Sequence, residues 1–137
     1  MSYSLHFRSY EQGEEQFIST KSIIDCFKSH IVDEEGLGFK VEYGKADTSF
    51  VHIDISNLYC SCFTVSKPCG DDRFYHSLLR VTKLGNYICI LPDGLFIVFD
   101  EKTLEHLPID LTEDVKQGRL EIKALDNIES FIETIQS

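Results

Sequence analysis

Apolar and polar residues alternate in several short segments of the chain, and this period of two is typical of half-buried β-strands. The alternation predicts strands at Ser2–Tyr10, Phe39–Tyr43 and Val51–Ile55. The run Leu58–Val65 is apolar on both faces, which predicts a strand that is covered on both sides or lies near the centre of a sheet. The first half of the chain is therefore expected to be rich in strands.

The strongest local signal is a β-hairpin in the second half. Two β-branched and aromatic runs, Asn86–Leu91 and Leu95–Asp100, are joined by a Pro-Asp-Gly turn sequence. We expect this hairpin to be central in the sheet. A further short strand is predicted at Arg119–Lys123.

Between the strands, apolar residues recur every three to four positions, which is the period of an amphipathic helix. The predicted helices are Ser19–Glu35, a segment capped by Asp71 or Asp72 that runs through Phe74, Leu78 and Val81, a short capped helix near Thr112–Gln117, and a final stripe of Leu125, Ile128, Ile132 and Ile135. Together the patterns predict one α+β domain over residues 1–137. We expect a mainly antiparallel sheet of about five to six strands, with three to four helices packed largely on one face.

The charge balance narrows the classes of partner. The chain has 13 lysines and arginines against 23 aspartates and glutamates, a formal net charge of −10. Such a surface repels phosphate backbones and anionic lipids, so we expect no nucleic acid and no membrane as partner, whereas a cationic protein would be attracted. Five cysteines, an odd number, and no apolar leader predict a reduced, cytoplasmic protein without a disulfide framework.

The segment Tyr59–His76 concentrates the residue types that carry chemistry. Its Cys-x-Cys pair, Cys60 and Cys62, lies in a strand pattern and lacks the spacing of a zinc-binding pair, so we expect no metal and no cofactor. Cys69 precedes a predicted helix that contains His76, an arrangement that can activate a thiol. The adjacent Asp71 and Asp72 disfavour a thiolate. A small enzyme or ligand-binding domain that uses this cluster is therefore kept as an alternative.

Three acidic clusters are the candidate partner-binding residues. They are Asp33, Glu34 and Glu35 at the end of the first predicted helix, Asp71 and Asp72 at the start of the second, and Asp110, Glu113 and Asp114 near the third. Carboxylates at a helix C-terminus oppose the macrodipole, so the first cluster does not stabilise its predicted helix. A function in binding is one explanation for its presence.

The whole chain, short, strongly acidic, α+β and without a catalytic motif, is similar to the immunity proteins of bacterial contact-dependent inhibition and other polymorphic toxin systems. This resemblance implies a non-enzymatic inhibitor that binds and neutralises a cognate toxin domain, often a basic nuclease. It assigns no individual residue. Binding through an exposed edge strand and a role as a structural subunit of an assembly both remain open.

Overall fold

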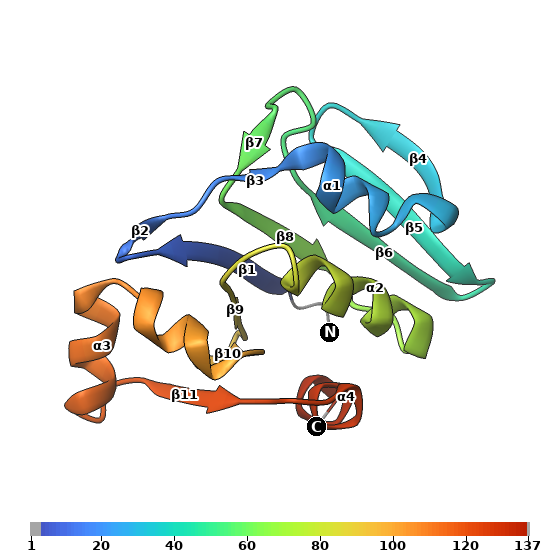
Figure 1. Cartoon of the computed structure of the whole chain (residues 1–137). Helices are drawn as coiled ribbons and strands as arrows, with labels where there is room; N and C mark the ends of the chain where they lie inside the picture. The colour runs from blue at the N-terminus through green and yellow to red at the C-terminus, as the bar shows by residue number, and fades with distance from the viewer. Residues whose placement is uncertain (1–3, 137) are drawn as a thin grey trace.

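The strand β1 (Ser4–Glu11) lies in the middle of the sheet, and its alternation decides which side faces the core. Leu5 and Phe7 are fully buried on one side, whereas His6 is exposed on the other. The structure is a computed structural model that describes residues 4–136, so Ser2 and Tyr3 of the predicted strand lie outside it. In Figure 1, β1 lies between helix α1 (Thr20–Asp25) above it and helix α3 (Ile109–Lys116) below it.

The described residues form a mixed sheet of nine strands, in the order β11-β10-β9-β1-β8-β6-β5-β4 with β2 attached to β1, and a separate two-stranded sheet, β3-β7. All pairs are antiparallel except β10 with β11. The strands after β1 are β2 (Glu14–Glu15), β3 (Ile18–Ser19), β4 (Ile31–Glu35), β5 (Gly38–Gly44), β6 (Asp47–His52), β7 (Tyr59–Cys60), β8 (Cys62–Ser66), β9 (Tyr87–Ile90), β10 (Leu95–Val98) and β11 (Glu121–Ala124). The predicted class, α+β, is confirmed, although the sheet has more strands than expected.

One face of the sheet, which we call the covered face, carries the main core. The α-helices are α1 (Thr20–Asp25), α2 (Asp72–Thr82), α3 (Ile109–Lys116) and α4 (Ile128–Gln136), and two 3-10 helices are η1 (Lys28–His30) and η2 (Glu101–His106). Phe27, just after α1, packs against Phe39 of β5 and Phe74 of α2, with ring centroids 5.5 and 6.5 Å apart. Phe131 of α4 meets Tyr75 of α2 at 5.6 Å. Helices α1, α2 and α4 therefore share one core with the covered face.

The opposite face of the sheet is covered at one end only. There Leu107, after η2, and Leu111 of α3 pack with Ile88 of β9 and Val98 of β10. Helices thus lie on both faces at this end, although α1, α2 and α4 all pack on the covered face. The rest of this second face, which we call the open face, presents exposed side chains along β1, β8, β6 and β5: His6, Arg8, Lys40, Glu42, His52 and Cys62.

The predicted first helix is wrong beyond its first turns. The chain forms α1 and η1, and from Ile31 it becomes the edge strand β4. Two causes favour this change: Ile31 and Val32 are β-branched, and three carboxylates would oppose the dipole of a helix ending at Glu35. Asp33, Glu34 and Glu35 therefore lie on a strand at the end of the sheet, where charged side chains are well tolerated.

Other predictions were confirmed in part. Asp71 caps α2 as expected, and the β9–β10 hairpin turns at Gly94 with φ +87°, but the hairpin lies towards the β11 end and is not central. The run Leu58–Val65 is divided between β7 and β8, and β8 is central but covered on one side only. The short third helix begins at Ile109, earlier than predicted, and has no side-chain cap.

Candidate protein-binding site

A hollow of about 510 Å³ lies along β6 and β8, in the half of the sheet that ends with β4, where three separate loops meet. Phe17, just before β3, and Tyr59 of β7 line it from one side. Leu37, in the turn between β4 and β5, lines it from the other. His52 and Cys62, both on the open face, also contribute to its lining. We call this hollow the apolar groove.

The apolar groove is bordered by large apolar side chains that the protein does not bury. Phe17 is 61% exposed, Leu37 76% and Tyr59 60%. Single exposed hydrophobic residues are common on protein surfaces, but several gathered around one hollow are typical of an interaction site. A partner that covers these side chains would remove their apolar surface from water.

The loops that carry these residues are held by backbone hydrogen bonds. Thr20 N donates to Leu58 O at 3.0 Å, and Ile53 N donates to Leu37 O at 3.2 Å. Gly38 has φ +148°, and a Cβ there would overlap the Val51 carbonyl, so only glycine permits the close approach of this turn to β6. The groove is thus formed by ordered backbone, which lowers the entropy lost when a partner binds.

Acidic side chains lie on the strand that leads into the apolar groove. Asp33, Glu34 and Glu35 are exposed on β4, directly before the turn that carries Leu37. None of the three forms an ion pair with another residue between 4 and 136. Asp54, which lines the groove, accepts hydrogen bonds from Ser56 N at 3.0 Å and from its Oγ. The free carboxylates of β4 can therefore pair with cations from outside.

In the second predicted acidic cluster, Asp71 has a structural role. Asp71 accepts hydrogen bonds from the Arg73 side chain and from Arg73 N, which together lower the pKa of Asp71 from 3.8 to about 2. Arg73 also donates to the carbonyl of Tyr43 on β5. Asp72 occupies the first turn of α2, where a carboxylate interacts favourably with the helix dipole. Neither Asp71 nor Asp72 lines the apolar groove.

The third cluster lies on α3, at the far end of the sheet from β4 (Figure 1). Asp114 pairs with Arg119 at 3.0 Å, and Glu113 lies 3.9 Å from Lys116. Asp110 is exposed in the first turn of the helix. The structure therefore does not join the three acidic clusters into one surface, and only Asp33, Glu34 and Glu35 lie beside the apolar groove.

The sequence-based search did not select the apolar residues of the groove. Leu37 has a local signal, because it stands between two glycines in a turn. Phe17 directly precedes β3 and Tyr59 belongs to β7, so their sequence context gives no such signal. Their exposure could not be inferred from spacing, since it depends on which other loops lie beside them.

The cysteine cluster does not form an activated thiol site. Cys69 is buried, its N–H donates to Ser49 Oγ at 2.9 Å, and burial raises the pKa of its thiol. Burial likewise raises the pKa of Cys60. A thiol whose pKa is raised by apolar surroundings is a poor nucleophile. Within residues 4–136, no three His, Cys, Asp or Glu side chains are grouped as metal ligands would be.

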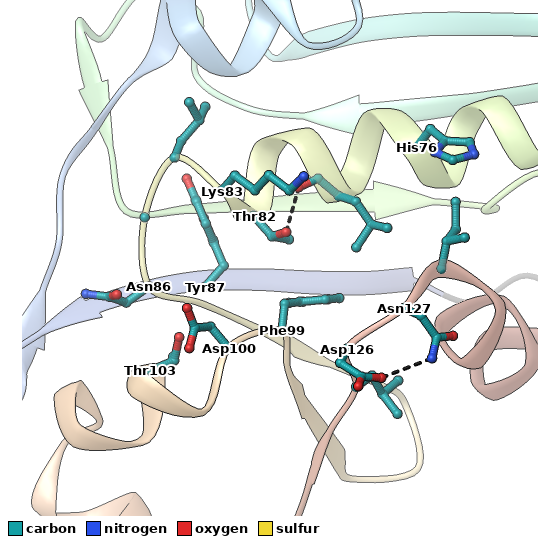
Figure 2. A pocket seen from close by; sticks show the side chains of 15 residues that line it. His76, Thr82, Lys83, Asn86, Tyr87, Phe99, Asp100, Thr103, Asp126 and Asn127 are labelled. Atoms are coloured by element: carbon teal, nitrogen blue, oxygen red, sulfur yellow. Dashed lines mark hydrogen bonds between the residues drawn. The ribbon is translucent and has the colours of Figure 1, made fainter.

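A second hollow, of about 590 Å³, lies between the end of α2, the start of η2 and the loop before α4 (Figure 2). His76 stands at one end of it and Asp100 at the other. Several of its polar groups are already used: Asp100 accepts from Lys102 N at 2.9 Å, and Asn127 Oδ1 accepts from Ser130 N at 2.8 Å. These groups cap helices and do not converge on a common point, as a catalytic set would.

Comparison of the chain with protein-family models, with curated proteins and with solved structures gave no match. Across residues 4–136, every helix is too short or too polar to cross a lipid bilayer. The apolar groove and the acidic strand that leads into it are the features of the described residues that point to a function.

Proposed function

We propose that this protein is a non-enzymatic binding protein, in its most concrete form an immunity-type inhibitor that neutralises a cationic toxin domain. One observation carries the proposal: large apolar side chains are exposed around a preformed groove beside three unpaired carboxylates, on a chain with net charge −10. Apolar surface of this kind supplies affinity, and the charge selects a basic partner. The cytoplasm is the compartment in which such an inhibitor would meet its toxin.

The apolar groove supplies most of the binding energy in this proposal. Phe17 is 61% exposed and Tyr59 60%, so a partner can still bury more than half of each aromatic side chain. This burial favours association to the extent that it exceeds the entropic cost of binding. These side chains would act as the central anchors of the interface, with the acidic residues at its rim.

The acidic surface acts mainly on the rate of association. Unlike charges attract two proteins over about 10 Å at 0.1 M salt, and this attraction weakens as salt rises. A toxin domain that binds nucleic acid presents a basic surface, which the acidic surface of this protein would attract. Carboxylates that occupy its substrate groove would block the enzyme without any chemistry.

The test is co-purification with the protein encoded next to this one, followed by calorimetry and stopped-flow measurement of the complex. We expect a one-to-one complex that forms more slowly at high salt. A Leu37→Ser, Tyr59→Ser variant is expected to bind about 30-fold more weakly, because truncating central anchors typically costs about 2 kcal/mol or more.

The matched control is Ile109→Ser. Ile109 is 73% exposed, close to the 76% of Leu37, but it lies on α3 at the other end of the sheet. Its substitution is expected to leave binding unchanged. Equal weakening by both variants, or binding that neither weakens, would contradict a role for the apolar groove, and the absence of any partner would contradict the proposed function itself.

A further inference from the structure

The strand β4 combines a free sheet edge with direct access to the apolar groove. We infer that the partner enters as an extended, lysine- or arginine-rich segment, which pairs with the outer edge of β4 and places one apolar side chain in the groove beside Leu37. The inference rests on the proposed function and names the kind of segment that the site accepts.

The first support is the position of β4. It is the last strand of the sheet, and β5 is its only strand partner among residues 4–136. One edge of its backbone is therefore free of β-ladder hydrogen bonds. Such an edge is a template on which an extended segment can form main-chain hydrogen bonds.

The second support is the distribution of charge. By register Asp33 lies opposite Lys40 and Glu34 opposite Phe39, so Asp33 lies on the open face and Glu34 on the covered face. Neighbouring Glu35 completes an edge whose carboxylates lie on both sides of the strand. A basic segment added to this edge meets opposite charges on both of its own faces.

The same charges disfavour a second copy of this chain as the occupant. Two β4 strands placed edge to edge would bring six carboxylates together, three from each copy. Like charges on neighbouring strands are destabilising. The edge therefore discourages self-association and accepts a cationic segment of another protein.

The third support is continuity between the edge and the groove. The chain runs from Glu35 through the turn residue Gly36 to Leu37, which lines the groove, so a single residue of the turn separates the acidic edge from the groove in sequence. The register between β4 and β5 shifts between Ile31 and Asp33, which limits regular pairing to Asp33–Glu35. So short a ladder needs an anchor, and the groove provides it.

The experiment uses the full chain and a synthetic peptide of consecutive arginines that ends in leucine, so that cationic side chains point to both faces of the added strand. Amide chemical shifts and hydrogen exchange are followed by NMR as the peptide is added. We expect slower exchange at the amides of β4 and shifts around Leu37 and Tyr59. Exchange at β11, the other edge of the sheet, is expected to stay unchanged.

Two controls separate main-chain pairing from simple charge attraction. The same peptide with alternate amides N-methylated keeps its charge but loses donors, and we expect it to bind at least about tenfold more weakly. A chain with Asp33→Lys, Glu34→Lys and Glu35→Lys should lose binding, whereas Glu121→Lys on β11 should not. Circular dichroism of each variant confirms that it is folded.

The outcomes are distinct from those of the co-purification. Peptide binding with shifts only around the groove and no protection at β4 would overturn strand pairing while leaving the proposed function standing. Equal affinity of the methylated peptide would overturn it as well, and so would an absence of peptide binding. Failure of the proposed function would appear instead as a missing protein partner.

Discussion

The two ends of the sheet are finished in different ways. At the β11 end, α4 packs on the covered face through Phe131, and η2 and α3 close the second face over Ile88 and Val98. At the β4 end, the covered face is closed by Phe27 and Phe74, but the open face and the edge have no cover within residues 4–136. Both ends expose some hydrophobic residues, such as Ile109 on α3, but towards the β4 end Phe17, Leu37 and Tyr59 gather around one hollow.

This difference indicates which end of the sheet has an uncovered surface that a partner could bind. The residues that cover the β11 end show that the chain can close both faces of its sheet. At the β4 end, Phe17, Leu37 and Tyr59 stay in water, and the adjoining acids make no ion pairs with residues 4–136. We therefore expect substitutions at the β11 end to change stability and substitutions at the β4 end to change binding.

The largest expected effect is at the β11 end, with Phe131→Ala. Phe131 is fully buried and meets Tyr75 and Phe99 at 5.6 and 5.1 Å. Removing the ring leaves a cavity between α4, α2 and the end of β10, and a loss of about 3–5 kcal/mol in the free energy of unfolding is expected. Urea denaturation measures it; a loss below about 1 kcal/mol would mean that α4 is only loosely attached.

A smaller effect is expected for Asp71→Asn. This variant compares the stability supplied by a carboxylate that is hydrogen-bonded within the protein with that supplied by the unpaired carboxylates of β4. Asparagine keeps an oxygen that can cap α2, so the variant loses mainly the charge that pairs with Arg73, and a cost of up to about 1 kcal/mol is expected. The pKa of Asp71 is depressed in the folded state, so the stabilisation by its charge is present above the ordinary value of 3.8 and is lost as pH falls towards about 2. The free energy of unfolding, measured from pH 5 to 2, should therefore fall less steeply in the variant than in the wild type.

The matched control for Asp71 is Glu34→Gln on β4, where no cap or ion pair is lost. Its stability is expected to follow the wild-type curve over the same pH range. If both variants lost the same stability, the distinction between a structural acid and a free acid would fail.

The smallest expected effect on stability is for Leu37→Ser. Because the side chain is mostly in water, the free energy of unfolding should change by less than about 0.5 kcal/mol. Thermal unfolding monitored by circular dichroism measures this. A loss comparable to that of Phe131→Ala would show that Leu37 belongs to the core and that the two ends of the sheet are alike.

Much of the fold could be predicted from short-range patterns. Alternation placed β1, β5 and β6, the Pro-Asp-Gly turn placed the β9–β10 hairpin, and the Asp cap placed α2. These features depend on neighbours in sequence, so spacing suffices to find them. The prediction failed at Ile31–Glu35, where helical spacing continued from α1 but the charges and β-branched residues favoured an edge strand.

The sequence by itself determined the α+β class, the acidity that favours a cationic partner, and the absence of a recognisable catalytic motif, because these follow from local order and composition. Only the tertiary structure decided that Phe17, Leu37 and Tyr59, from three distant segments, surround one groove, and that of three acidic clusters one lies beside it. The physical reason is that exposure depends on what the rest of the chain places next to a side chain. That arrangement is made by contacts between residues far apart in sequence.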